Sequence, residues 1–186
     1  MKKITLLGDS IRQIGYGSKV PALLGEDYTV FQPEDNCRFA KYTLRGVLHE
    51  WKEGIAGSDI IHWNNGLWDI CDLGDGAFSS EEEYVANMVR IAKLLKQQAK
   101  VVIFATTTPV TSDNPDLKNE RIKRYNDILI PKLQEIGILI NDLFGLVYQN
   151  IDSYIRKDDK IHLTDAGIDV CAKQVLNSIK EAEALL

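Results

Sequence analysis

The chain has 186 residues, of which 45% are hydrophobic and 26% are charged. One hydrophobic core typically serves roughly 100 to 200 residues, so we expect a single domain over 1–186. The formal net charge of -5 gives no general positive field, which argues against nucleic acid and anionic membrane surfaces as partners. We therefore expect a small neutral or weakly charged ligand.

The three cysteines, Cys37, Cys71 and Cys171, are far apart and form no CxxC pair. This spacing suggests neither a disulfide framework nor a zinc site, and it suits a reducing compartment. The apolar run after the basic start is too short for a signal peptide because Asp9 interrupts it. No apolar stretch approaches the roughly 20 residues that span a bilayer. We expect a cytoplasmic protein without a membrane segment.

Short apolar runs suited to buried strands alternate along the chain with longer segments of helical period. This alternation is typical of a parallel sheet covered by helices on both faces, so the fold class is α/β, a three-layer α/β/α sandwich. In chain order, we predict strands at 3–7 and 28–32, a helix at 42–52, a strand at 59–63, a helix at 80–98, a strand at 100–106, a helix at 119–135, a strand at 138–141 and a final helix after Thr164.

Three of these helices carry recognisable end signals. Ser80 and Glu83 have the spacing of a capping box, which predicts a helix start at this point. Gly137 is a helix stop after 119–135, and Thr164 is a good N-cap for the last helix. Four polar loops, at 33–41, 64–79, 107–118 and 152–163, remain. Ligands bind outside the carboxyl ends of parallel strands, so these loops are where we expect the chemistry.

The first candidate for chemistry is Gly8-Asp9-Ser10, directly after an apolar strand. A glycine at a strand end permits a sharp turn that presents the following serine beside backbone N–H groups. The tripeptide is also a common turn sequence. The second candidate is the Asp159-Lys160-Ile161-His162 segment, just before the last helix. A serine needs an imidazole to accept its proton, and the imidazole needs a carboxylate to orient it.

Together these two segments resemble the nucleophile block and the acid and base block of the SGNH (GDSL-like) hydrolase superfamily. Softer similarities lie at 106–109, 125–126 and 141–143, so the resemblance covers nearly the whole chain. The resemblance implies a flavodoxin-like fold with a five-stranded parallel sheet. It also implies a catalytic triad in which Ser10 is the nucleophile, His162 the base and Asp159 the acid, with no metal or organic cofactor.

The third candidate segment runs from His62 to Asp69, at the end of the third predicted strand. The family usually has Gly-x-Asn-Asp here, with the asparagine amide as an oxyanion donor. Gly66 and Asp69 fit that pattern, but Trp68 stands in the asparagine position. Asn64 or Asn65 could replace the missing amide, and we favour Asn64. For Asp9 and Asp69, we expect hydrogen bonds from loop N–H groups.

The remaining family block supplies a backbone N–H from the loop after the second strand. This loop contains no glycine. Cys37 is the candidate donor by position, and Asn36 tolerates positive φ better. The predicted oxyanion hole thus comprises the N–H groups of Ser10 and Cys37 and the amide of Asn64.

Several other interpretations of these residues have less support. Cys37 could be a thiol nucleophile, but Ser10 already has the strand-to-turn setting. The Gly15-Tyr16-Gly17 run lacks the third glycine of a dinucleotide fingerprint. The first loop also lacks the Ser, Thr and Gly run that would bind the phosphate of a flavin. His62 lies in a predicted buried strand, which favours a structural histidine over a metal ligand.

We expect a serine esterase that cleaves small acyl groups, above all acetyl, with acetylated carbohydrates among its candidate substrates. Its partner would be a small-molecule ester. Trp63, Trp68 and Phe39 are candidates for a platform under a sugar ring. The alternative is an SGNH-fold binding or regulatory domain with weakened catalysis, which the departures in the two oxyanion blocks suggest.

Overall fold

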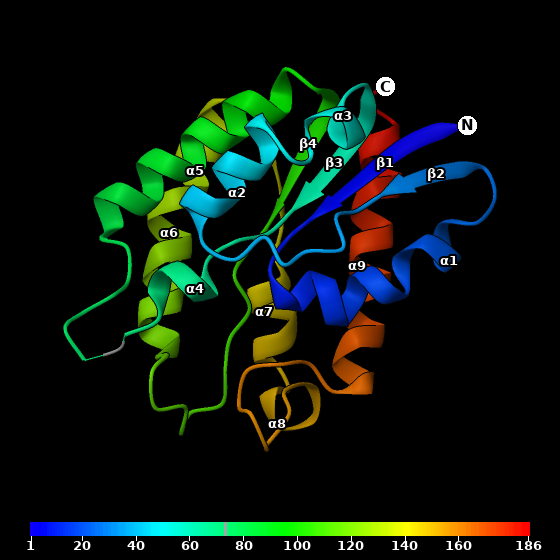
Figure 1. Ribbon diagram of the computed structural model, residues 1–186. Coiled ribbons are helices and arrows are strands. Elements are labelled where there is room, and N and C mark those ends of the chain that lie inside the picture. The colour runs from blue at the N-terminus through cyan, green and yellow to red at the C-terminus, as the bar shows by residue number, and fades with distance from the viewer. Residues whose placement is uncertain (73) are drawn as a thin grey trace.

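The computed structural model describes residues 1–72 and 74–186. Within these residues, all the strands form one parallel sheet in the order β2-β1-β3-β4-β5 (Figure 1). The strands are β1 (Lys2–Leu7), β2 (Tyr28–Phe31), β3 (Ser58–Trp63), β4 (Ala99–Ala105) and β5 (Leu139–Asn141). Each predicted strand is present, with ends that differ by no more than one residue, and the predicted α/β fold class is confirmed.

Helices cover both faces of this sheet (Figure 1). On one face lie α2 (Ala40–Leu48), α5 (Glu81–Lys96) and α6 (Asn119–Glu135), and on the other lie α1 (Val20–Leu24) and α9 (Asp165–Glu183). The shorter helical segments are η1 (Ile11–Gly15), η2 (Tyr16–Ser18), α3 (Lys52–Ile55), α4 (Leu67–Ile70), α7 (Leu143–Tyr148) and α8 (Ile151–Tyr154).

The predicted helix starts at Ser80 and Thr164 are confirmed by their caps. The Ser80 hydroxyl accepts a hydrogen bond from the Glu83 N–H at 3.2 Å, and the Glu83 carboxylate accepts one from the Ser80 N–H at 3.4 Å. The Thr164 hydroxyl accepts the Gly167 N–H at 3.1 Å. Such caps satisfy N–H groups that have no partner within the helix, which fixes where each helix begins.

The helix predicted at 42–52 is wrong in its bounds. It begins at Ala40 and ends at Leu48, and His49 leaves the helical region with φ -129° and ψ -82°. The chain then turns back so that the Trp51 ring packs against Gly46, where a Cβ atom would lie only 2.4 Å from that ring. This contact ends α2, and a separate short helix, α3, follows.

The polar loops meet at the carboxyl edge of the sheet, as the parallel topology requires. β1 runs directly into Gly8 and Ser10, and β3 into Asn64, while Leu7 pairs with Trp63 in the ladder between them. In the described part of the chain, no helix has both the length and the apolar character that crossing a membrane requires.

Candidate active site

Ser10 lies at the turn that links β1 to η1. Its backbone is helical, with φ -60° and ψ -25°, and its N–H has no intramolecular acceptor among the described residues. The turn needs glycine at position 8, because a Cβ atom there would lie 2.0 Å from the Asn64 side-chain oxygen. The segment that follows is a π-helical turn, a geometry found frequently at functional sites.

His162 and Asp159 form a locally ordered pair. The Nδ1 atom of His162 lies 3.0 Å from one Asp159 oxygen, and the other oxygen accepts the N–H groups of His162 and Ile161 at 2.9 and 3.0 Å. Partial burial raises the pKa of Asp159, but these hydrogen bonds outweigh it, so the net pKa lies below its usual value. Asp158 instead accepts a hydrogen bond from Arg156 at 3.0 Å.

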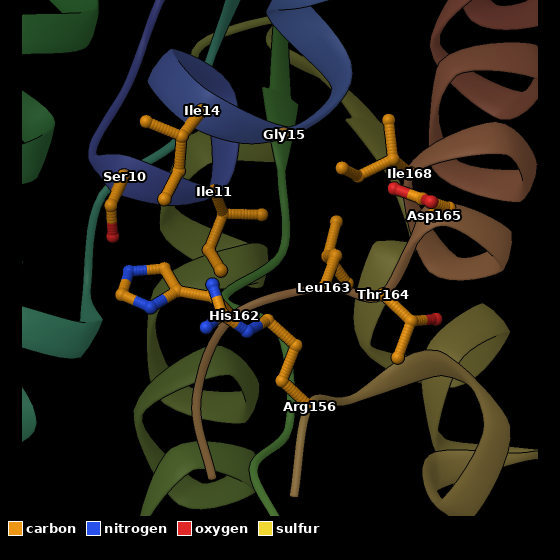
Figure 2. A pocket seen from close by; sticks show the side chains of 10 residues that line it. All are labelled: Ser10, Ile11, Ile14, Gly15, Arg156, His162, Leu163, Thr164, Asp165 and Ile168. Atoms are coloured by element: carbon orange, nitrogen blue, oxygen red, sulfur yellow. The ribbon is translucent and has the colours of Figure 1, made fainter. Parts of the chain in front are cut away.

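The structure brings Ser10 and His162 together from opposite ends of the chain. The Ser10 hydroxyl points toward the imidazole of His162 (Figure 2). Both side chains line the same two clefts. A serine facing an imidazole that is held by a carboxylate is the arrangement that proton transfer from a nucleophile requires.

One cleft on each side of this pair is open to a ligand. The α9 cleft, of about 460 Å³, combines apolar and polar groups; besides Ser10 and His162 its lining includes Ile11, Ile14, Arg156, Leu163, Thr164 and Ile168 (Figure 2). The apolar cleft, of about 400 Å³, has mainly apolar walls; its lining includes Phe39, Leu67, Trp68, Phe78, Leu117 and Ile161.

Asn64 is held in a buried hydrogen-bond network with Tyr16 and Asp9. Its side-chain oxygen accepts the Tyr16 hydroxyl at 2.6 Å, and its amide nitrogen donates to Asp9 at 2.8 Å. An amide nitrogen carries two N–H groups, so one remains without an acceptor among the described residues. Asn65 differs, because its oxygen accepts Trp63 and Thr43 and its nitrogen donates to the Arg38 carbonyl. Asn65 therefore holds the loop together.

Removal of the Tyr16 hydroxyl tests whether the orientation of Asn64 matters for catalysis. Tyr16→Phe keeps the buried ring but loses the hydrogen bond that orients the Asn64 amide. We expect kcat for an ester to fall about tenfold with KM unchanged, the effect of one hydrogen bond. The matched control is Tyr84→Phe, which removes an equally buried hydroxyl that donates to the Asn65 carbonyl at 3.1 Å. Equal losses in both variants, or a rise in KM alone, would contradict the prediction.

The structure does not support Cys37 as an oxyanion donor. Its N–H donates to the Gly8 carbonyl at 3.1 Å, and the residue is wholly buried. Burial also raises the pKa of the Cys37 thiol to about 11, which disfavours the thiolate that a nucleophile needs. From Asn36 to Ala40, each N–H except that of Phe39 has an intramolecular acceptor in the described part of the chain. Phe39 also lines the apolar cleft.

The aromatic residues predicted as a platform separate into two groups. Trp63 is wholly buried in the core, so its part in that prediction is wrong. Phe39 and Trp68 do line the apolar cleft, together with Phe78, which the sequence did not single out. The turn that presents Trp68 depends on Gly66, whose φ is +150° and where a Cβ atom would lie 2.0 Å from the Thr107 hydroxyl.

Asp9 and Asp69 accept loop N–H groups, as predicted. Asp9 accepts the Ile11 N–H at 3.0 Å, and Asp69 accepts the Ala40 N–H at 2.9 Å and the Ser79 hydroxyl at 2.8 Å. Burial nevertheless raises the pKa of both carboxyls, that of Asp69 to about 6. Asp69 thereby ties α4 to the start of α2 and to the loop before α5.

The raised pKa of Asp69 makes a prediction for stability. The folded protein holds the Asp69 proton more tightly than the unfolded chain, so this residue's contribution to stability falls as the pH rises from about 4 to about 6. Relative to Asp69→Asn, the free energy of unfolding of the wild type should fall by up to about 3 kcal/mol between about pH 4 and about pH 7. Urea unfolding of both proteins measures this. The same comparison with Asp75→Asn, a substitution at an exposed site, should change by less than about 0.5 kcal/mol over this pH range. An increase with pH in the stability of the wild type relative to Asp69→Asn would contradict the prediction.

Arg12 is a buried part of the site that the sequence analysis missed. Its guanidinium donates to the carbonyls of Pro33, Gly8 and Asp35 at 2.8, 3.1 and 2.7 Å. It thus joins the turn that carries Ser10 to the loop after β2. Nothing in the local sequence signals a buried cation, because its acceptors are backbone carbonyls of a distant loop.

His62 is buried in β3, as predicted, and lies 3.0 Å from the Asn141 amide nitrogen through its Nε2 atom. Burial lowers the pKa of this imidazole to about 3, so it is neutral. Among the residues of the softer family similarities, Asn126 forms two hydrogen bonds with the backbone of Thr107. Its side-chain oxygen accepts the Thr107 N–H and its amide nitrogen donates to the Thr107 carbonyl, each at 3.0 Å. In the chain as described, no three His, Cys, Asp or Glu side chains converge as a metal site.

Comparison with known proteins finds similarity both in sequence and in fold. No family model matches the chain. The chain is 32% identical to the Arabidopsis thaliana protein GDSL esterase/lipase CPRD49, in an alignment that covers 97% of this chain and 80% of the relative. The solved structure of a lipase/acylhydrolase from Enterococcus faecalis matches with a TM-score of 0.79 and 21% identity, covering 97% of this chain and 96% of that one. The acetylxylan esterase Axe2 from Geobacillus stearothermophilus matches with a TM-score of 0.80 and 16% identity, covering 96% and 94%.

Proposed function

Because the chain belongs to the GDSL esterase/lipase family and is a carboxylic ester hydrolase, we propose that it acts through an acyl-enzyme formed on Ser10. The observation that carries the proposal is the meeting of Ser10 and His162 at the two clefts, with Asp159 3.0 Å from the far side of the imidazole. No metal or organic cofactor takes part in this mechanism.

In the first step, His162 removes the Ser10 proton while the Ser10 oxygen bonds to the ester carbonyl carbon. The tetrahedral intermediate then collapses, the bond from carbon to the alcohol oxygen breaks, and His162 returns its proton to the leaving alcohol. In the second step, His162 takes a proton from water, whose oxygen attacks the acyl-enzyme. The carboxylic acid leaves, and Ser10 regains its proton. Asp159 holds the imidazole in the tautomer that both steps need.

The oxyanion of each intermediate is bound, in this proposal, by the Ser10 N–H and the Asn64 amide. Two observations support it: the Ser10 N–H has no intramolecular acceptor among the described residues, and Tyr16 and Asp9 fix the orientation of Asn64. The Phe39 N–H, which also lacks such an acceptor, takes the place proposed from the sequence for Cys37. Removal of one such donor typically lowers kcat by a factor of about 10² to 10³.

For the substrate, we propose a small-molecule ester with a short acyl group, above all acetyl. The acetylxylan esterases among the similar structures share the fold, so acetylated carbohydrates are assayed beside acetates of simple alcohols. The three free thiols, Cys37, Cys71 and Cys171, are compatible with the proposed cytoplasmic location.

Hydrolysis of p-nitrophenyl acetate, compared with p-nitrophenyl esters of longer acids, tests this proposal. We expect a higher kcat/KM for the acetate than for the octanoate. Preference for long acids would reject the short-acyl assignment, and the absence of hydrolysis above background for every ester would favour a binding domain with weakened catalysis.

A further inference from the structure

The apolar cleft beside Ser10 and His162 has a composition that restricts what can bind there. Its walls include Phe39, Leu67, Trp68, Phe78 and Leu117, and among the described residues that line it none is an Asp, Glu, Lys or Arg. The α9 cleft on the opposite side includes Arg156 and Asp165. The two sides of the Ser10–His162 pair are therefore chemically different, and each suits a different part of an ester.

Two of the aromatic side chains in the apolar cleft are unusually exposed for their size. Trp68 is 46% exposed and Phe78 57% exposed, while Phe78 packs against Phe39 with ring centroids 5.2 Å apart. Binding of an apolar ligand to exposed aromatic rings in a cleft is favourable, because it removes apolar surface from water. A group with several hydroxyls would instead lose hydrogen bonds to water there, because the walls offer few replacements.

The apolar cleft is large enough for the alcohol half of an acetate ester, and its apolar walls decide the kind of alcohol that fits. At about 400 Å³, it lies within the range of pockets that enclose much of a small organic ligand, and the methyl group of an acetyl ester would leave most of it empty. His162, which must return a proton to the leaving alcohol, lines this cleft as it lines the α9 cleft. An alcohol in the apolar cleft can therefore receive that proton, and the apolar walls are what favour this cleft for an apolar alcohol.

We propose that the apolar cleft binds the alcohol part of the substrate and that this part is an uncharged alkyl or aryl group. The preferred substrates are then acetates of apolar alcohols, with acetylated sugars as poorer substrates. This inference rests on the proposed function, and it adds the chemical class of the leaving group.

Two series of esters test this assignment with the 186-residue chain, the acid released being titrated at constant pH. One series varies the alcohol, from methyl to hexyl acetate, and the other varies the acid, from methyl acetate to methyl hexanoate. We expect kcat/KM to rise about twofold to fourfold with each methylene of the alcohol, the gain from burying one such group. The acid series should stay flat or fall. A rise in the acid series with a flat alcohol series would overturn the proposal, as would a higher kcat/KM for a monoacetylated methyl xyloside than for hexyl acetate.

Variants identify the cleft responsible. Phe78→Ala and Trp68→Ala should flatten the dependence on alcohol length, because they remove aromatic walls of the apolar cleft. The matched control is Tyr148→Ala, which removes an aromatic ring of similar exposure, 54%, that lines a different hollow beside Asn150. Its dependence should equal that of the wild type. If Ile14→Ala in the α9 cleft flattens the dependence and Phe78→Ala does not, the alcohol binds on the other side and the proposal is wrong.

A binding measurement separates this inference from the proposed function. If no ester shows hydrolysis that depends on Ser10, the catalytic proposal fails, and titration of Ser10→Ala with 1-hexanol, followed by calorimetry, still tests the cleft. We expect saturable binding that Phe78→Ala, added to the same background, weakens at least about fivefold. No binding, or binding that Phe78→Ala leaves unchanged, would overturn the proposal.

Discussion

Replacing Ser10 with alanine is expected to lower kcat/KM for an acetate ester by about 10⁴-fold or more, the scale of losses when a serine nucleophile is removed. The hydroxyl makes no side-chain hydrogen bond to the described residues, and it lies at the cleft surface where no core packing depends on it. The variant should therefore fold normally. Initial rates with p-nitrophenyl acetate, and the melting temperature of each protein, measure the two effects.

Ser18→Ala is the matched control for this variant. Ser18 follows in the same connection between β1 and α1, but its hydroxyl donates to the Gly15 carbonyl at 2.8 Å and lines neither cleft. Its activity should stay within about twofold of the wild type, while its stability falls by about 1 kcal/mol from the lost hydrogen bond. A Ser10→Ala protein that retains a tenth or so of the wild-type rate would exclude an acyl-enzyme on Ser10.

Asp159→Asn is expected to lower kcat by about 10³- to 10⁴-fold, because an amide in this position favours the wrong tautomer of His162. The side chain keeps its shape and an oxygen that can still accept the N–H groups of Ile161 and His162. The loop should therefore persist while catalysis fails. The pH dependence of kcat, measured over the whole range in which the protein is folded, should show no recovery at any pH.

The neighbouring Asp158→Asn is the matched control. Both aspartates lie in one loop, and Arg156 pairs with each of them, with its Nε atom 3.3 Å from Asp159. Only Asp159 lies beside the imidazole, at 3.0 Å. Burial of the Asp158 carboxylate is slight, and its ion pair with Arg156 is exposed, so its loss should change kcat by less than about threefold. A larger loss of kcat for Asp158→Asn than for Asp159→Asn would contradict the assignment of Asp159 as the carboxylate that orients His162.

The fold was largely predictable because its strands and long helices carry strong local patterns. The apolar runs of the five strands and the capping box at Ser80 are each complete within a few residues. The short helices α1, α4, α7 and α8 were missed, since four to six residues give too little periodicity to separate a helix from a loop. α1, α7 and α8 pack against α9, and α4 packs against α6, so contacts between distant segments stabilise them.

The candidate site was likewise predictable only where its residues carry local sequence signals. Asp159 and His162 lie three residues apart, so a local motif was sufficient to pair them, and the family resemblance joined them to Ser10. The oxyanion donors depend on backbone hydrogen bonds between distant segments, and the bond from Cys37 to Gly8 at 3.1 Å has no sequence signature. Likewise, the contacts of Tyr16 with Asn64 and of Arg12 with the loop after β2 join residues that are distant in the sequence.

Ser10 is, in this proposal, an activated nucleophile, and reaction with a fluorophosphonate tests its activation most directly. A fluorophosphonate transfers its phosphonyl group to a serine oxygen with loss of fluoride, so intact mass and peptide mapping identify the residue. We predict a single adduct on Ser10 that forms much faster in the folded protein than in the urea-unfolded chain, and that His162→Ala abolishes. Equal rates in the folded and unfolded states, or an adduct on another residue, would contradict the account and favour a binding domain that retains the fold without the chemistry.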